Sequence, residues 1–224
     1  MPRDRVDEYE FAIAFEVVAP GEIARLLGEL EATALPRRRA GIRHAMRHPG
    51  IANIARSEAL LELAEESLGR GALPFRATLF EKSPAANWLV AWHQDTALPL
   101  GERRDTPGWG PWSVKEGLTY AHAPAEALSK VLALRLHLDD STAENAPLRV
   151  LPGTHRQGVL SDAEMHALAS RVAAVECAVP RGGVLAMRPL LVHASSKSTG
   201  ALPRRVLHIE YAAKMRVGDG LAMA

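Results

Sequence analysis

The first third of the chain carries hydrophobic positions at helical spacing. Isoleucine and leucine recur every three or four residues over 23–30, with charged residues between them. A second such stretch follows Ser57, a residue type that often caps a helix N-terminus, and stops at Gly69. The basic run 37–39 between them fits an exposed loop, with anion binding as the alternative. This pattern predicts helical support over residues 1–73.

From Pro74 onward the period of the hydrophobic pattern changes from 3.6 to 2. The expected strands cover residues 75–81, 88–93, 131–138, 148–151, 172–179, 183–187 and 205–212. One helix interrupts them after Ser161, where Ser161 and Glu164 form a capping-box pattern. Because strands and helices do not alternate, we expect a mainly β fold with flanking helices (α+β). It would be a single domain, 1–224, with a jelly-roll core over 74–213 and the N-terminal helices packed on one sheet.

The segment 96–124 is too long and too rich in Gly, Pro and Trp for a simple turn. Loops of this length in compact domains are usually functional lids or are disordered. Trp109, Trp112, Lys115 and Tyr120 would suit a lid over substrate. The alternative, which the sequence leaves open, is a hydrophobic plug that pins the loop.

Composition places the chain among ordinary globular proteins. It has 224 residues, 47% hydrophobic and 24% charged, and its net charge of +1 gives no general attraction to nucleic acid or to an anionic membrane. No apolar run reaches the roughly 18–20 residues that span a bilayer, and the charged start lacks the apolar stretch of a secretory signal. One cysteine cannot form an internal disulfide. We therefore expect a cytoplasmic protein with a small-molecule partner, and no nucleic-acid or membrane partner; the oligomeric state stays open.

Candidate chemistry begins with His93 and Asp95. On a strand, residues two positions apart place their side chains on the same face. Two imidazoles and one carboxylate form the facial triad of non-haem Fe(II) oxygenases, so a distant histidine is needed as the third ligand. His193, about a hundred residues later and directly after an expected apolar strand, fits this role. The structural alternatives are a hydrogen-bonded pair at a sheet edge and a core histidine.

A second pair with the same spacing, His137 and Asp139, competes with the first. Only 56 residues separate His137 from His193, too few for the intervening strands and helix. We therefore expect His137 and Asp139 to be structural or to face substrate. Glycine-rich phosphate loops, Cys-x-x-Cys pairs and a serine nucleophile elbow are missing from the sequence, which argues against nucleotide-binding, structural-zinc and α/β-hydrolase functions.

Four ordered motifs carry a resemblance to a known family. They are Trp92-His93-Gln94-Asp95, the segment from Ala146 to Arg156, the segment from Met187 to Ser195, and the segment from Pro203 to Tyr211. In order and spacing they resemble the phytanoyl-CoA dioxygenase family of Fe(II)- and 2-oxoglutarate-dependent oxygenases. The resemblance covers residues 75–213, nearly two-thirds of the chain.

The resemblance implies a double-stranded β-helix, a cupin-like jelly-roll barrel, in which His93, Asp95 and His193 bind Fe(II). The co-substrate 2-oxoglutarate and O2 would take the remaining coordination positions. Arg204 matches the family's arginine by its offset of eleven from His193, and a guanidinium holds a carboxylate in a planar fork. Ser195, two residues after His193, and Thr78 match further co-substrate contacts. By strand alternation the next residue, Arg205, should face the surface.

The sequence departs from the family where Arg135 stands in place of an expected aromatic residue. Arg135, His137, Trp112 and Lys115 are therefore candidate substrate contacts rather than family matches. For His208, which shares strand parity with Arg204, core packing is the favoured interpretation over a place beside the site.

The predicted activity is Fe(II)- and 2-oxoglutarate-dependent hydroxylation of a small metabolite, with release of succinate and CO2. Because Asp95 fills the third ligand position, halogenation is disfavoured; desaturation, epoxidation and ring formation stay open. The alternatives are a jelly-roll protein that binds a ligand without turnover, and a cupin-like metalloenzyme, such as an isomerase, that does not use 2-oxoglutarate. The family name does not imply phytanoyl-CoA as the substrate.

Overall fold

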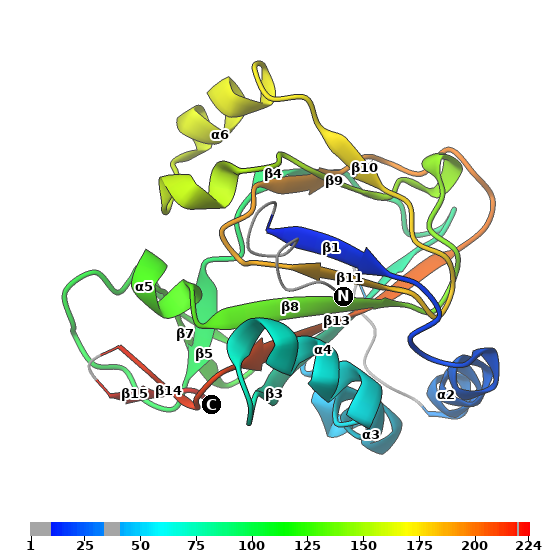
Figure 1. Ribbon diagram of the computed structural model, residues 1–224, viewed down its shortest axis with the longest axis horizontal. Helices are drawn as coiled ribbons and strands as arrows, with labels where there is room; N and C mark the ends of the chain where they lie inside the picture. Colours follow the sequence, from blue (N-terminus) through cyan, green and yellow to red (C-terminus); the bar gives the residue numbers. More distant parts are fainter. Residues whose placement is uncertain (1–9, 34–40, 219) are drawn as a thin grey trace.

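Two antiparallel sheets form the centre of the protein, and the computed structural model describes residues 10–33, 41–218 and 220–224. The larger sheet has the strand order β1 (Phe11–Ala14), β11 (Val184–Met187), β8 (Val131–His137), β13 (Arg204–Ala212), β3 (Leu73–Lys82) and β2 (Gly41–Ile42). The smaller sheet has the order β10 (Val175–Cys177), β9 (Leu148–Val150), β12 (His193–Ser195) and β4 (Val90–His93). Figure 1 shows the smaller sheet above the larger one. The predicted jelly roll is confirmed, although strand pairing within the described residues does not close it into a barrel.

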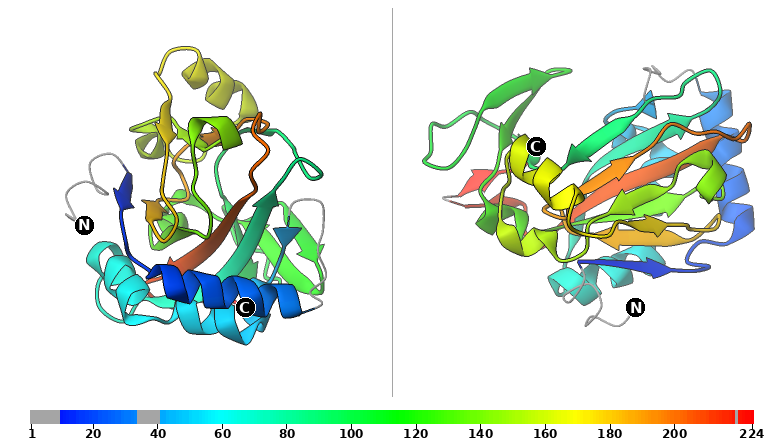
Figure 2. Two further views of the ribbon diagram at one scale, coloured as in Figure 1. Left: turned by 90° about the vertical axis from the view of Figure 1, so that its right-hand side faces the viewer. Right: turned by 90° about the horizontal axis from the view of Figure 1, so that it is seen from above.

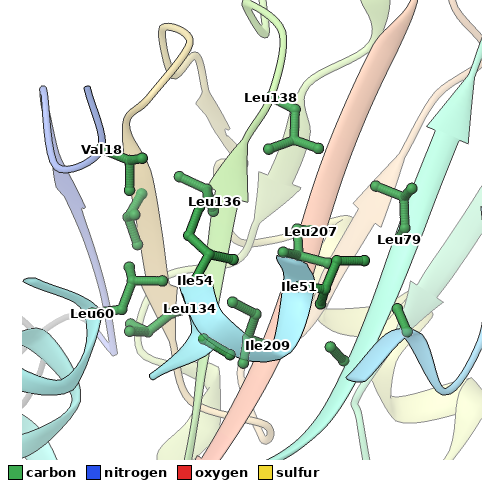
Figure 3. Close-up of a cluster of buried hydrophobic side chains, with 14 of the residues drawn as sticks. Val18, Ile51, Ile54, Leu60, Leu79, Leu134, Leu136, Leu138, Leu207 and Ile209 are labelled. Carbon is green, nitrogen blue, oxygen red and sulfur yellow. The ribbon is translucent and has the colours of Figure 1, made fainter. Parts of the chain in front are cut away.

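Three helices cover the outer face of the larger sheet: α2 (Pro20–Ala32), α3 (Pro49–Ala55) and α4 (Glu58–Leu68). Ile51 and Leu60 from these helices pack with Leu134, Leu207 and Ile209 of the sheet, and all five side chains are fully buried (Figure 3). Burying a side chain of this size contributes roughly 1.5–3 kcal/mol. The helices therefore stabilise the sheet from one side and leave its other face for the site.

The segment predicted as one long loop instead contains a three-stranded sheet, so that prediction was wrong. The strands are β5 (Ala97–Leu100), β6 (Trp112–Lys115) and β7 (Leu118–His122), with β7 in the centre. Figure 2 shows this unit at one end of the jelly roll. Trp109, which precedes β6, is buried in a cluster with Leu98 and Leu128. Its packing agrees with the alternative of a hydrophobic plug.

The remaining elements are short. They are α5 (Ala125–Leu128), α6 (Asp162–Ala169), the 3₁₀ turns η1 (Ala45–Arg47), η2 (Ala143–Asn145) and η3 (Thr154–Gln157), and a hairpin of β14 (Arg216–Val217) and β15 (Leu221–Ala222). The capping box of α6 is confirmed, because Ser161 and Glu164 each accept a backbone N–H of the other. Ser57 and Gly69 bound α4 as expected, but the Ser57 side chain makes no capping bond. No helix in the described ranges is long and apolar enough to cross a membrane.

The sequence prediction missed the strands β1, β2, β12, β14 and β15 and the helices α3 and α5. The strand expected directly before His193 is not formed, and β12 begins at His193 itself. The strand expected over 172–179 is shorter, since only Val175–Cys177 pairs with β9. The basic run 37–39 lies outside the described residues.

Candidate metal centre

His93, Asp95 and His193 each place a possible ligand atom within 4.8 Å of the others. His93 ends β4, His193 begins β12, and the two are direct cross-strand partners with imidazole centroids 4.1 Å apart. The Asp95 carboxylate lies 3.8 Å from Nε2 of His93 and 3.5 Å from Nε2 of His193. The fold therefore brings together the three residues that the sequence analysis selected as metal ligands.

Backbone carbonyls orient both imidazoles. Nδ1 of His93 lies 2.9 Å from the carbonyl oxygen of Ala91, and Nδ1 of His193 lies 2.9 Å from that of Leu191. A proton on Nδ1 that is donated to a carbonyl leaves the lone pair on Nε2, the arrangement of a metal-ligating histidine. Both Nε2 atoms are near the carboxylate of Asp95.

The backbone beyond β4 is held by contacts with the loop that precedes His193. The N–H of Asp95 donates to Pro189 O at 2.9 Å. The buried Gln94 side chain donates to Leu190 O at 2.7 Å and accepts from the N–H of Leu160 at 2.8 Å. Because β4 ends at His93, these bonds, rather than the strand pairing expected from the i, i+2 spacing, fix the Asp95 carboxylate beside the imidazoles.

The charge states of His193 and Asp95 suit a cation. Burial, with a smaller contribution from the neighbouring His93, lowers the pKa of His193 to about 3. Burial by itself would raise the pKa of Asp95, but His193, His208, His93 and the Arg76 guanidinium hold it well below its usual range. At neutral pH His193 is therefore neutral and Asp95 ionised, as metal coordination requires. Two imidazole nitrogens and one carboxylate are a donor set that fits Fe(II).

A cavity of about 120 Å³ opens beside the three candidate ligands. Its apolar walls are Phe80, Trp88, Val90 and Leu148, and its further polar residues are Lys82, Arg135, Ser195, Arg204 and His208. His93 and Asp95 expose 37% and 28% of their side chains, whereas His193 exposes 2%. The accessible side of the candidate centre is therefore the side of His93 and Asp95.

Arg204 enters this cavity and Arg205 does not. Nε of Arg204 donates to Asn145 O at 3.1 Å, and an NH2 group donates to Ser195 Oγ at 3.3 Å. Arg205 instead forms hydrogen bonds of 2.8 Å with the carboxylate of Asp139. The opposite directions that strand alternation predicted for the two arginines are confirmed, and Asp139 has a structural contact.

Lys82 is a further cation of the cavity, beside Arg204 and Arg135, and the sequence analysis missed it. Its Nζ donates to Ser195 Oγ at 2.7 Å and lies 5.5 Å from the centre of the Trp88 ring. Burial, together with the charges of Arg204 and Arg135, lowers the pKa of Lys82 to about 8. The two-residue period of β3 puts Lys82 on the face of the sheet that carries the cavity, a signal visible in the sequence once that face is known.

Arg135 and His208 form a pair near Asp95. An NH1 group of Arg135 lies 3.0 Å from Nδ1 of His208, and the guanidinium lies 5.5 Å from the centre of the Phe80 ring. Nε2 of His208 is 3.9 Å from the carboxylate of Asp95. Core packing was the favoured interpretation of His208, but the residue lines the cavity instead.

Four other predicted site residues lie outside this cavity. Thr78 and Lys115 line a separate pocket. Trp112 packs against the cluster around Trp109. His137 is buried, and neither ring nitrogen has a hydrogen-bond partner among the described residues.

The chain matches a known protein family over most of its length. The family model described as Phytanoyl-CoA dioxygenase (PhyH) matches residues 7–206. The chain belongs to the phytanoyl-CoA dioxygenase family. The matched range contains all three candidate ligands together with Ser195 and Arg204.

One curated relative is L-proline trans-4-hydroxylase of Streptomyces griseoviridis. It is 27% identical to this chain over 188 residues, which make up 71% of the chain and 62% of the relative. The aligned part therefore covers less than two thirds of the relative's own length.

Solved structures share the fold at lower identity. AviO1 from Streptomyces viridochromogenes Tue57 has a TM-score of 0.70 and 23% identity, and the match covers 98% of this chain and 96% of AviO1. EctD from S. alaskensis, solved with 2-oxoglutarate and 5-hydroxyectoine, has a TM-score of 0.73 and 19% identity, with 97% of this chain and 77% of EctD covered. These similarities support the jelly-roll fold of the chain.

Proposed function

We propose that this protein is a non-haem Fe(II)- and 2-oxoglutarate-dependent dioxygenase that hydroxylates a C–H bond of a small molecule. The observation that carries the proposal is the cluster of His93, Asp95 and His193 at one side of a cavity that also contains Arg204. Membership of the phytanoyl-CoA dioxygenase family and similarity to a proline hydroxylase support it.

His93, Asp95 and His193 would hold the Fe(II) ion. Two neutral imidazoles and one carboxylate on one side of the ion leave positions for a chelating co-substrate and O2. The carbonyls of Ala91 and Leu191 keep each imidazole in the tautomer that offers Nε2.

Arg204, Ser195 and Lys82 would bind the distal carboxylate of 2-oxoglutarate. A guanidinium offers a carboxylate two parallel hydrogen bonds, and the two neighbouring donors add a hydroxyl and an ammonium. Lys82 and Arg204 both contact Ser195 Oγ, so the three groups already point to one place. EctD, which has the same fold, was solved with 2-oxoglutarate.

When bound, Fe(II), 2-oxoglutarate and O2 would supply the oxidant: one oxygen atom of O2 would enter succinate with release of CO2, and the other would enter the substrate C–H bond. The protein's part is to orient the reactants and to exclude water. Phe80, Trp88, Val90 and Leu148 form the apolar wall that does so. Desaturation, epoxidation and ring formation use the same oxidant, and the hydroxylase named above favours hydroxylation.

The test is succinate formation by the purified protein with Fe(II), 2-oxoglutarate and O2, together with calorimetric binding of 2-oxoglutarate to the Mn(II)-loaded protein without O2. We expect binding to need the metal and succinate to form slowly even without substrate. If 2-oxoglutarate binds but succinate never forms with any candidate substrate, the protein is the ligand-binding alternative. If the metal binds and 2-oxoglutarate does not, the isomerase-like alternative holds.

We further propose a cytoplasmic location and a single catalytic domain over 1–224. Cys177, the one cysteine of the chain, is buried and free, as is common in a reducing compartment. Cell fractionation with an antibody to the native protein tests the location, and recovery in the membrane or secreted fraction would contradict it.

A further inference from the structure

A second, basic pocket lies next to the metal centre on the same face of the larger sheet. It is lined by Arg43, His44, Arg76, Thr78, Lys115 and Tyr120, has a volume of about 90 Å³, and is called the basic pocket below. Along β3, Lys82 and Phe80 line the metal-centre cavity, whereas Thr78 and Arg76 line the basic pocket. Residues two apart on a strand are about 7 Å apart, so one molecule of metabolite size can reach both sites.

The backbone builds this pocket from three separate segments. Gly41 pairs with Phe80, and a side chain at Gly41, whose φ is +123°, would collide with the Leu79 carbonyl. This close pairing brings the next residues, Arg43 and His44, to the edge of β3, and His44 takes the left-handed conformation with φ of 50°.

Lys115 reaches the pocket from the other side. It ends β6 directly before the Glu116-Gly117 turn, in which both residues have positive φ. Its ammonium lies 5.0 Å from the centre of the Tyr120 ring.

The charges of the pocket are unbalanced. The Arg76 guanidinium is already neutralised by a buried ion pair with Glu210. Within the described ranges, neither Arg43 nor Lys115 forms an ion pair with a carboxylate. Burial lowers the pKa of Lys115, and the nearby charges of Arg43 and Arg76 add to this effect. Glu116 approaches from the turn, with its carboxylate 3.8 Å from Nε2 of His44, and does not line the pocket. The pocket therefore offers two cations, a hydroxyl and a phenol to a small anion.

The pocket connects to the metal centre through polar side chains. Thr78 is the register partner of His208 on β13, and Nε2 of His208 lies 3.9 Å from both the Asp95 and the Glu210 carboxylates. Arg76 extends this row of polar side chains through its ion pair with Glu210. A substrate held in the basic pocket would thus extend toward the open side of Asp95.

We propose that the basic pocket binds a carboxylate or phosphate group of the substrate through Arg43 and Lys115, so that the enzyme acts on a small anionic metabolite. This inference rests on the proposed function for its substrate role. Under this proposal Thr78, which the sequence analysis assigned to 2-oxoglutarate, would contact the substrate. The pocket volume suits one anionic group rather than a whole metabolite.

The experiment uses the full chain loaded with Mn(II) and saturated with 2-oxoglutarate without O2, so that the metal-centre cavity is filled. Inorganic phosphate and, separately, acetate are titrated by calorimetry at constant ionic strength. The variant Arg43→Gln/Lys115→Gln is compared with Arg70→Gln/Lys214→Gln, which removes the same charge from exposed positions. We expect the first variant to bind the anion at least tenfold more weakly and the second to bind as the parent does.

Unchanged anion affinity in Arg43→Gln/Lys115→Gln would overturn the proposal. So would a tenfold loss of 2-oxoglutarate affinity in that variant, because the pocket would then serve the co-substrate. Tighter binding of phosphate than of acetate assigns a phosphorylated substrate, and the reverse order assigns a carboxylic acid. If the parent binds neither metal nor 2-oxoglutarate, the titrations are repeated on the metal-free chain; loss of anion binding in the variant then retains the pocket as an anion site while the dioxygenase proposal fails.

Discussion

The two faces of β13 have opposite chemistry. Leu207, Ile209 and Tyr211 point to the helices and are fully buried, and the only polar atom among these side chains, the Tyr211 hydroxyl, donates to Ala55 O at 2.7 Å. Arg204, His208 and Glu210 point to the other side and are also buried. Side-chain alternation thus lets one strand supply both a dry core and a polar site.

The difference lies in how each face compensates for burial. The helix-side face gains from removal of apolar area from water, about 25 cal/mol per Å². On the inner face, Glu210 pairs with Arg76, His208 with Arg135, and Arg204 with backbone and hydroxyl acceptors. Buried charges are tolerated only when they are paired in this way. The stability of the sheet and the chemistry of the site should therefore respond to different substitutions.

The largest expected effect follows from Asp95→Ala on the inner side. Removing the only carboxylate of the candidate triad should lower succinate formation roughly a thousandfold, about 4 kcal/mol in activation free energy. Mn(II) titration and a succinate assay measure both consequences. Asp140→Ala, which removes an exposed carboxylate outside the cavity, is the control. Retention of parental Mn(II) affinity in Asp95→Ala would refute the triad.

On the helix side, Ile209→Ala should lower the free energy of unfolding by about 2–5 kcal/mol, because it leaves a cavity in a fully buried cluster. The affinity for 2-oxoglutarate should stay within a factor of two or so of the parent. Urea unfolding and calorimetry give the two numbers, and Val159→Ala, at a position 50% exposed, serves as the control. A loss below 1 kcal/mol or so would show that this face contributes less than its burial indicates.

Neighbouring arginines offer a matched pair across the strand. Arg204→Ala should weaken 2-oxoglutarate binding about 10- to 100-fold, or about 1.4–2.8 kcal/mol, because a buried charge-assisted fork is lost. Arg205→Ala should leave that affinity unchanged, since its partner is Asp139 on the other side. The measurement is the dissociation constant of the Mn(II)-loaded protein. Equal losses of 2-oxoglutarate affinity in the two variants would contradict the placement of Arg204 in the cavity and Arg205 outside it.

The smallest expected effect is a pH dependence from Lys82. Its pKa is about 8 in the folded protein and near 10.5 when unfolded, so between these values the unfolded chain binds more protons. The contribution of Lys82 to stability should therefore rise with pH from about 8 to 10.5. In Lys82→Met this contribution is absent. Urea unfolding of the metal-free proteins across this window tests it; a parent-minus-variant difference that does not change with pH would be the opposite result.

Much of the candidate site could be predicted because its residues are close in sequence or fixed by strand period. The spacing of His93 and Asp95 selected a pair that does lie together, although Asp95 lies beyond the end of β4 and is placed by loop hydrogen bonds. Alternation separated Arg204 from Arg205. Strand period gives the face of Lys82 and of His208, but which residues of that face reach the cavity depends on the register of β3, β13 and β8. That register is set by long-range pairing, which a local pattern does not contain.

The fold shows the same limit. The helices α2 and α4, which have a clear apolar stripe, and α6, which has a capping box, were predicted from the sequence. The seven-residue α3 has too few turns to show a period. The strand β12 has three residues, fewer than periodicity can detect. Strands β5 to β7 were taken for a loop, because Gly and Pro between them outweighed the short alternating runs.

The direct pairing of His93 with His193 gives a bound ion a mechanical role. Strand β4 is the edge of the smaller sheet, and its partner β12 comes from a part of the chain about a hundred residues away. An ion bound by both strands would act as a removable cross-link that closes a very long loop. The stability gained from such a cross-link rises only slowly with the length of the loop. Chelation should therefore let the edge strand β4 open more often, so that a protease cuts there faster than in the metal-loaded protein.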